Sequence, residues 1–139
     1  MKKPFFILSG VLSVTLLIIL SSFQKTPPFD LKSSMVRGKE IYMTNCITCH
    51  MDLGQGIEGI YPPLAKSDYL MADKRRSIQQ VLYGVSGEIK VNGKPYNMEM
   101  TGFSLSDKEA SDVLNYVRNT FGNKGNPVTP EEVKATRKK

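Results

Sequence analysis

The sequence predicts an all-α domain of about four helices with one short hairpin. Apolar residues recur at helical spacing in several stretches, most regularly from 107 to 121, and a helix-capping Ser, Thr or Asp precedes each stretch. Strand-like alternation is confined to residues 88–96, which is too short to build a sheet. At 139 residues, the chain fits one small domain with extensions.

Residues 1–24 are expected to be a targeting segment. Lys2 and Lys3 precede an apolar run over residues 5–20, as in a secretory signal peptide. Residues 5–23 also approach the ~20 residues that span a bilayer, so an uncleaved membrane anchor is the alternative. Either reading exports the rest of the chain to the periplasm.

Residues 25–33 are expected to be a tether, followed by a domain over residues 34–123. Ser33 or Ser34 is the expected N-cap of a first helix that runs to about Thr44. Its expected inward-facing residues are Met35, Val36, Gly38, Ile41 and Tyr42. Gly38 costs a helix about 1 kcal/mol relative to alanine. The glycine therefore marks either the close approach of another helix or an incidental choice near the helix start.

The most specific motif follows this helix: Cys46-Ile47-Thr48-Cys49-His50, which holds both cysteines and the single histidine of the chain. C-x-x-C-H is the attachment sequence of c-type haem. Two thiols at this spacing on a helical turn can each form a thioether with a haem vinyl group, and the adjacent imidazole then reaches the iron. The sequence therefore predicts one covalently attached haem c.

Three other readings of the motif are weaker. A thioredoxin-like redox pair requires a βαβ context, and nothing before Cys46 resembles a strand. A zinc site would stay one ligand short unless a carboxylate or a second chain supplied the missing ligand. A disulfide between the two cysteines is compatible with export but leaves the position of His50 unexplained.

Residues 51–64 carry three glycines and two prolines and are expected to form a long irregular loop over one face of the haem. A haem-ligating histidine usually donates its second ring N–H to a carbonyl or carboxylate. The carbonyl of Pro62 or Pro63 is the candidate acceptor.

A short helical turn is expected over residues 67–71. A helix is then expected over residues 74–83, capped by Asp73 and ended by Gly84. The run Lys74-Arg75-Arg76 begins this helix. It is either a docking patch, a contact for the haem propionates or a solvated helix face, and we favour the solvated face.

A hairpin is expected around Asn92-Gly93. The stretch after it, residues 96–103, is expected to be irregular and carries Met98 and Met100. A thioether is a soft ligand that raises the potential of cytochromes c. Either methionine is therefore a candidate for the sixth iron ligand, and the ligand chemistry alone does not choose between them.

The last clear helix is expected from the Ser106/Glu109 capping box to about Phe121. It should cross the first helix, with Gly38 at the contact. Residues 124–139 are expected to form an extension with a short helix after Thr129 and a mobile basic tail from Arg137.

The chain resembles a class I monohaem cytochrome c, in particular bacterial periplasmic members, over about residues 35–123. The resemblance rests on the order of the Gly38/Tyr42 helix, the C-x-x-C-H motif, Tyr61-Pro62-Pro63-Leu64, Val81-Leu82-Tyr83-Gly84, the Asn92-Gly93 stretch, the methionine loop and the last helix.

This resemblance implies that Cys46 and Cys49 carry the thioethers and that His50 is the proximal ligand. It further implies that the Pro62 carbonyl holds the His50 ring and that Met100 is the distal ligand. The family usually has proline after that methionine, whereas this chain has Thr101. Met98 therefore remains an alternative.

The expected function is electron transfer without catalysis, because a six-coordinate haem leaves no open site. The alternative is a haem-based ligand sensor or enzyme subunit with an open distal site. Without Lys2 and Lys3 the net charge falls from +6 to +4. This mildly basic charge does not indicate nucleic-acid binding, but it suits redox partners with acidic surfaces. The protein is expected to be a monomer or a subunit of a respiratory complex, with membrane association through its N-terminal segment as an option.

Overall fold

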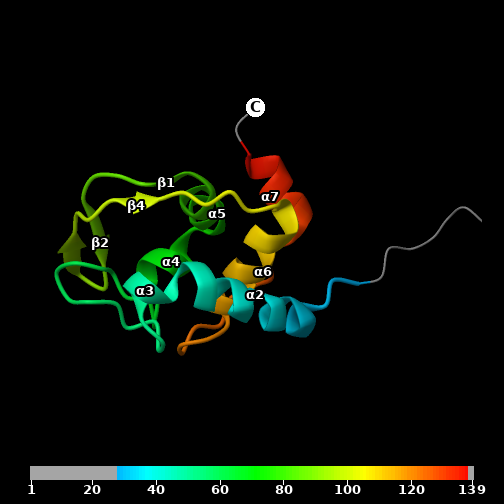
Figure 1. Ribbon diagram of the computed structural model, residues 1–139, viewed down its shortest axis with the longest axis horizontal. Helices are drawn as coiled ribbons and strands as arrows, with labels where there is room; N and C mark the ends of the chain where they lie inside the picture. Colours follow the sequence, from blue (N-terminus) through cyan, green and yellow to red (C-terminus); the bar gives the residue numbers. More distant parts are fainter. Residues whose placement is uncertain (1–27, 138–139) are drawn as a thin grey trace, which may run out of the picture.

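The computed structural model describes residues 28–137, which form six helices and four short strands (Figure 1). Two of the helices, α2 (Leu31–Asn45) and α6 (Asp107–Arg118), cross at the centre of the fold. At the crossing, a Cβ built on Gly38 would lie 1.9 Å from the carbonyl oxygen of Asp112. The helix contact predicted at Gly38 is therefore confirmed. The mainly helical architecture is confirmed too, with two short helices more than the four expected.

The N-cap predicted for the first helix is wrong. Helix α2 begins at Leu31, because the Asp30 side chain accepts a hydrogen bond from Ser33 N. The predicted tether therefore ends before residue 33. Ser34 is buried and its hydroxyl donates to the Asp112 carboxylate at 2.6 Å. Val36, expected to face inward, is 64% exposed because it lies away from α6.

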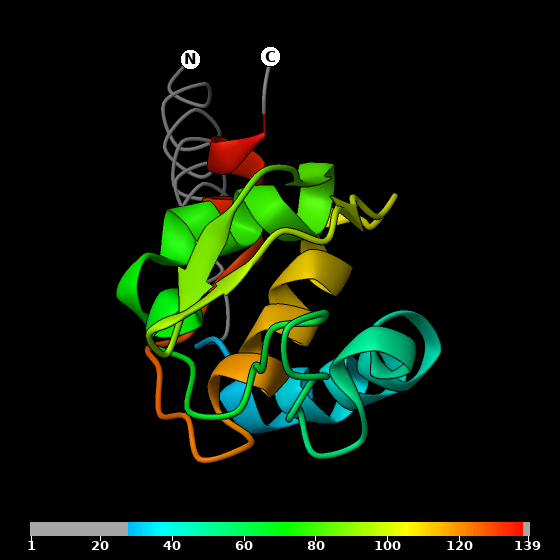
Figure 2. The ribbon, with the colours of Figure 1, turned by 90° about the vertical axis from the view of Figure 1, so that its left-hand side faces the viewer.

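Four shorter helices complete the helical part: α3 (Ile47–His50), α4 (Asp68–Ala72), α5 (Lys74–Tyr83) and α7 (Pro130–Thr136). Asp73 caps α5 and Gly84 ends it, as predicted. Thr129 and Glu132 form the capping box of α7. In Figure 2, α6 runs between α5 and α2 and contacts both.

The predicted hairpin is present as strands β2 (Ile89–Val91) and β3 (Lys94–Tyr96). Asn92 and Gly93 both have positive φ, as the tight turn requires. A second pairing was not predicted: β1 (Gly84–Val85) runs antiparallel to β4 (Met100–Thr101). The methionine stretch is thus less irregular than expected.

Helix α6 ends three residues earlier than predicted, and Phe121 instead turns back in a positive-φ conformation. Its ring packs 5.4 Å from that of Tyr42 and 5.6 Å from that of Tyr116. This aromatic cluster closes the α2–α6 crossing on one side.

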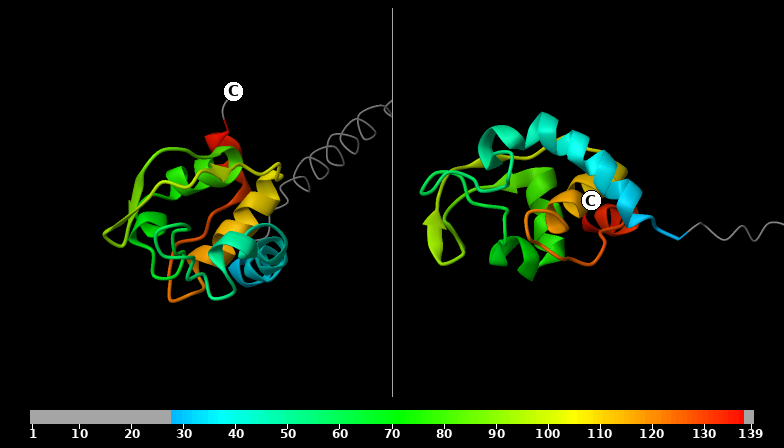
Figure 3. Two further views of the ribbon diagram at one scale, coloured as in Figure 1. Left: turned by 60° about the vertical axis from the view of Figure 1, so that its left-hand side comes forward. Right: turned by 90° about the horizontal axis from the view of Figure 1, so that it is seen from below.

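The C-terminal extension packs against the domain through α7, which contacts α6 and α5 (Figure 3). Val128 and Val133 are fully buried. Arg137, expected to begin a mobile tail, pairs with Asp107 at 2.5 Å and donates to Leu105 O at 2.6 Å. The mobile-tail prediction is wrong at this residue.

Within residues 28–137, no helix is long and apolar enough to cross a membrane. The N-terminal segment predicted as signal peptide or anchor lies outside the described residues, as do most of the tether and residues 138–139.

Candidate haem-binding site

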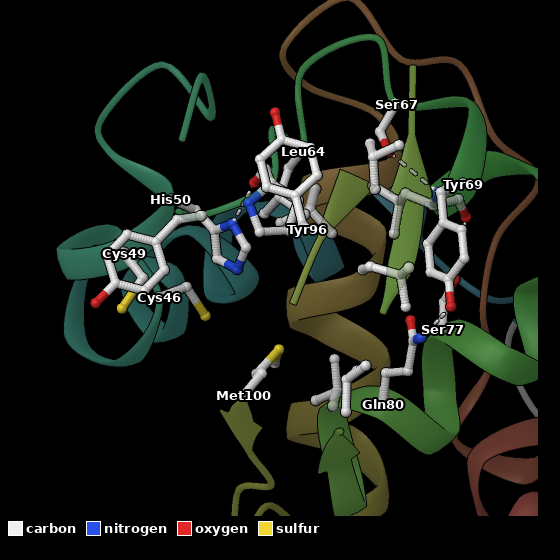
Figure 4. A pocket seen from close by; sticks show the side chains of 18 of the residues that line it. Cys46, Cys49, His50, Leu64, Ser67, Tyr69, Ser77, Gln80, Tyr96 and Met100 are labelled. Carbon is white, nitrogen blue, oxygen red and sulfur yellow. Dashed lines mark hydrogen bonds between the residues drawn. The ribbon is translucent and has the colours of Figure 1, made fainter. Parts of the chain in front are cut away.

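A cavity opens between α3, the loop after His50, α5, the hairpin and β4 (Figure 4). It encloses about 1210 Å³ of space outside the protein atoms, including open solvent at its mouth. Its walls are mainly apolar and include Leu64, Leu70, Val81, Val91, Leu114 and Val117. A large, flat, mostly apolar group fits this space.

The motif residues reach the cavity because the chain continues as one helical turn after α2. Cys46 N bonds Tyr42 O at 2.9 Å and His50 N bonds Cys46 O at 3.0 Å. Both thiols, which are free, and the imidazole of His50 line the same wall of the cavity (Figure 4). Met51 then takes a positive φ and ends the helix.

The His50 ring is held by the loop that follows it. Its Nδ1 lies 2.9 Å from the carbonyl oxygen of Pro62 and donates to it, so Pro62 rather than Pro63 makes the contact. Burial lowers the pKa of His50, and the carbonyl only partly opposes this shift. Burial thus favours the neutral ring, in which the Nε2 lone pair is available to a metal.

Loop 51–64 is shaped by close backbone packing. Gly56 N donates to His50 O at 3.0 Å, and a Cβ on Gly56 would lie 2.3 Å from Tyr61 O. The buried Tyr42 hydroxyl donates to Met51 O at 2.6 Å. These contacts bring the Pro62 carbonyl back to His50 across twelve residues.

The thiols sit in an apolar environment. Burial, followed by the neighbouring Cys49, raises the pKa of Cys46 to about 11. Among residues 28–137, no group of three His, Cys, Asp or Glu residues is arranged to hold a metal ion. Both thiols are free and line the apolar cavity.

Met100 lies across the cavity from the motif. Its segment is fixed by the pairing of Val85 with Met100 in β1–β4 and by the bond from Phe103 N to Val81 O at 2.9 Å. Figure 4 shows the Met100 sulfur pointing toward the wall that carries Cys46 and His50. Met98 also lines the cavity, but its side chain is 53% exposed.

Sequence analysis missed a polar group at the end of the cavity away from the thiols (Figure 4). It consists of Ser67, Tyr69, Ser77 and Gln80, from the α4 and α5 region. Tyr69 and Gln80 stand at no distinctive sequence spacing, so only the packing of α4 against α5 reveals the cluster.

The site is thus complementary to an amphiphilic macrocycle that carries a metal. It offers two thiols and an imidazole on one wall, a thioether on the opposite wall, apolar sides and a polar far end. Within a mainly helical fold, this combination defines a protein that holds haem through a C-x-x-C-H motif.

Comparison with known proteins agrees with this class. The family model of cytochrome c matches residues 35–121. The chain is 41% identical over 112 residues to cytochrome c-552 of Thermus thermophilus, covering 73% of this chain and 85% of the relative. The chain belongs to the cytochrome c family, as a class I monohaem member with one covalently attached haem c.

Two longer relatives contain a similar domain. The cytochrome c subunit of a quinone alcohol dehydrogenase from Gluconobacter oxydans is 36% identical over 88 residues, covering 62% of this chain and 18% of the relative. A cbb3-type cytochrome c oxidase subunit FixP from Azorhizobium caulinodans is 33% identical over 105 residues, covering 74% of this chain and 34% of the relative. The chain is therefore an electron-transfer protein that exchanges electrons with redox partners.

Proposed function

We propose that this protein is an electron carrier without enzymatic activity, with haem held by thioethers to Cys46 and Cys49 and by axial bonds from His50 and Met100. One observation carries the proposal: the His50 imidazole and the Met100 thioether enter the same apolar cavity from opposite walls. When bound, the haem supplies reversible one-electron chemistry at its iron.

The proximal role suits His50 because its Nδ1 proton is held by the Pro62 carbonyl, 2.9 Å away. A bond at Nδ1 fixes both the tautomer and the ring plane. Nε2 is then the free ligand atom. Through this hydrogen bond, loop 51–64 keeps the His50 ring from rotating out of the cavity.

Two contacts favour Met100 over Met98 as the distal ligand. Val85 pairs with Met100, and a Cβ on Gly102 would lie 2.5 Å from Leu82 O, so the backbone from Met100 to Gly102 is fixed against β1 and α5. Met98 lies outside the strand pairs and is more than half exposed. Thr101 of β4, which stands where the family usually has proline, pairs with Gly84 of β1 and so helps to fix Met100 in this chain.

His50 and Met100 would together hold the iron and would leave no site there for a substrate. This supports a carrier over the alternative, a ligand sensor or enzyme subunit with an open distal site. The +4 charge of the exported part supports transient partners with acidic docking surfaces, and we expect the transfer rate to fall as salt rises.

We further propose a periplasmic location, with residues 1–24 as signal peptide or membrane anchor, a tether that ends at Asp30, a domain to residue 123 and a C-terminal extension. The basic, apolar N-terminal run supports export. The mass of the mature protein distinguishes a cleaved from an anchored form.

The optical spectrum of the purified exported protein tests the proposal, recorded oxidised, then reduced, then with carbon monoxide. We expect a low-spin spectrum with a sulfur-to-iron band that carbon monoxide leaves unchanged. A high-spin spectrum, or one that carbon monoxide shifts, would instead favour the sensor or enzyme reading and reduce Met100 to a packing residue.

A further inference from the structure

The backbone is strained at the residue that directly follows His50. Met51, where α3 ends, has φ 63° and ψ 169°. This conformation is essentially restricted to glycine, because in any other residue the Cβ meets the neighbouring backbone. A methionine persists in it only where the surrounding contacts hold it.

Three hydrogen bonds hold Met51. Its N–H donates to Ile47 O at 2.8 Å, which attaches it to α3. Its carbonyl oxygen accepts from Gly54 N at 3.2 Å and from the Tyr42 hydroxyl at 2.6 Å. The bond from Tyr42 is the shorter of these two. Because Tyr42 is 0% exposed, its hydroxyl is also shielded from competing water.

The position of this hydroxyl is set by the α2–α6 crossing. The Tyr42 ring lies 5.4 Å from the ring of Tyr116 in α6 and 5.4 Å from that of Phe121. Tyr42 also stands one helical turn after Gly38, on the buried side of α2. The packing of the two long helices thus fixes the side chain that bonds to Met51 O.

Met51 connects His50 to the loop that orients its ring. The loop begins at Met51, returns through the bond from Gly56 N to His50 O at 3.0 Å, and brings Pro62 O to 2.9 Å from His50 Nδ1. In an ordinary backbone conformation, Met51 would direct the chain away from this path. The Pro62 carbonyl would then move away from the His50 ring.

We infer that Tyr42 is a positioning residue for electron transfer: its hydroxyl holds Met51 in the strained conformation and so keeps the Pro62 carbonyl on the His50 ring. The inference deepens the proposed function and rests on its assignment of His50 as an axial ligand. A carbonyl bonded at Nδ1 makes the imidazole a more basic ligand, which favours ferric iron. Through the backbone, Tyr42 therefore helps to set the reduction potential.

Exchange of the His50 Nδ1 proton, followed by NMR of the reduced haem-loaded protein, tests this role, since the Pro62 carbonyl protects that proton. Tyr42→Phe should accelerate the exchange about ten-fold, the factor that corresponds to loss of one buried hydrogen bond. It should also raise the reduction potential, because the imidazole becomes less basic. The matched control Tyr116→Phe removes a hydroxyl from the same aromatic cluster and should change neither quantity.

An unchanged exchange rate in Tyr42→Phe, or an equal change in Tyr116→Phe, overturns the inference. A hydroxyl with a merely structural role would lower the stability of the fold without altering the exchange rate or the potential.

A second substitution tests whether Tyr42 acts through Met51. Met51→Gly in the Tyr42→Phe background should return the exchange rate and the potential toward wild type, because glycine adopts this conformation without strain. Leu53→Gly in the same background adds a glycine to the loop at an exposed residue without positive φ, and it should restore neither. Rescue by both glycine substitutions, or by neither, overturns the inference.

Urea unfolding tests the strain without the Tyr42 substitution. Met51→Gly should have a higher free energy of unfolding than Met51→Ala, because alanine truncates the side chain but keeps the Cβ that causes the strain. Equal or lower stability of Met51→Gly overturns the inference.

The sulfur-to-iron band separates failure of this inference from failure of the proposed function. A wild-type protein without the band contradicts ligation by His50 and Met100, whatever the variants show. If the band is present in wild type and in Tyr42→Phe while the exchange rate stays unchanged, only the role of Tyr42 is contradicted.

Discussion

Gly38 of α2 packs against the backbone of Asp112 in α6, so closely that a Cβ would lie 1.9 Å from the Asp112 carbonyl oxygen. The Asp112 carboxylate binds back to α2, through Arg37 Nε at 2.6 Å and Ser34 Oγ at 2.6 Å. One residue of α6 thus holds the crossing through both its backbone and its side chain. The crossing matters for the site because α2 leads directly into the haem motif.

Gly38→Ala should destabilise the protein by about 3 kcal/mol or more, since the new methyl group meets backbone that cannot move without separating the helices. Urea unfolding followed by circular dichroism measures the change. The exposed neighbour Lys39→Ala should stay within about 0.5 kcal/mol of wild type. A Gly38→Ala variant as stable as Lys39→Ala would show that the helices can separate at little cost.

Acid should weaken the crossing through Asp112. Burial alone would raise the pKa of Asp112, but hydrogen bonds from Arg37, Lys108 and Ser34 together hold it below its usual value. A carboxyl whose pKa is lower in the folded state adds stability above its unfolded pKa, and loses it as pH falls through the folded value.

We therefore expect Asp112→Asn to cost about 1–3 kcal/mol at pH 7 and to flatten the fall in stability below roughly pH 5. Urea midpoints measured across this range check the prediction. Glu40→Gln, an exposed change on α2, should keep the wild-type pH profile. If the urea midpoints of both variants fall with decreasing pH in parallel with those of wild type, Asp112 is not the group that titrates.

Met100→Ala should convert the haem to a high-spin form or lower its reduction potential, because a thioether ligand favours the reduced iron. Met98→Ala should leave the spectrum and the sulfur-to-iron band in place. The optical spectrum and a redox titration of both variants decide the matter. The reverse result would make Met98 the distal ligand and leave Met100 as part of β4.

Asn115→Leu should release the C-terminal extension. The Asn115 side chain accepts from Val128 N at 2.7 Å and donates to Val128 O at 2.8 Å, and Val128 is fully buried. The substitution would leave Val128 N unpaired at a cost of about 1–3 kcal/mol, whereas Val128 O would keep its bond from the Ser111 hydroxyl at 2.7 Å. Hydrogen exchange over residues 124–136 should accelerate while the haem spectrum stays unchanged.

Lys134→Leu controls for the added leucine at an exposed position of α7 and should exchange like wild type. Unchanged protection in Asn115→Leu would mean that other contacts, such as the Lys74–Glu132 pair, hold the extension alone.

Several features were predictable because their cause lies within a few residues of the chain. The C-x-x-C-H spacing puts two thiols and an imidazole on one helical turn. The caps at Asp73, Ser106 and Thr129 and the turn at Asn92-Gly93 depend on local hydrogen bonds and backbone angles. The Gly38 contact was predictable as well, because glycine destabilises a helix and its presence there indicates the close approach of another helix.

What failed depended on partners far along the chain. Ser34 looked like a cap but serves as a buried partner of Asp112, 78 residues away. Arg76 was expected to be solvated, but its guanidinium lies over the ring of Tyr69 from α4. Arg137 was expected to be mobile, but it forms an ion pair with Asp107.

By itself, the sequence determined the fold class, the covalent haem and the wall of the site that carries the two thiols and the imidazole, because short-range spacing specifies them. The tertiary structure decided which carbonyl holds His50, how β1 pairs with Met100 and where the polar end of the cavity lies. Those features arise when segments separated by many residues pack together, and chain order carries no direct signal of that packing.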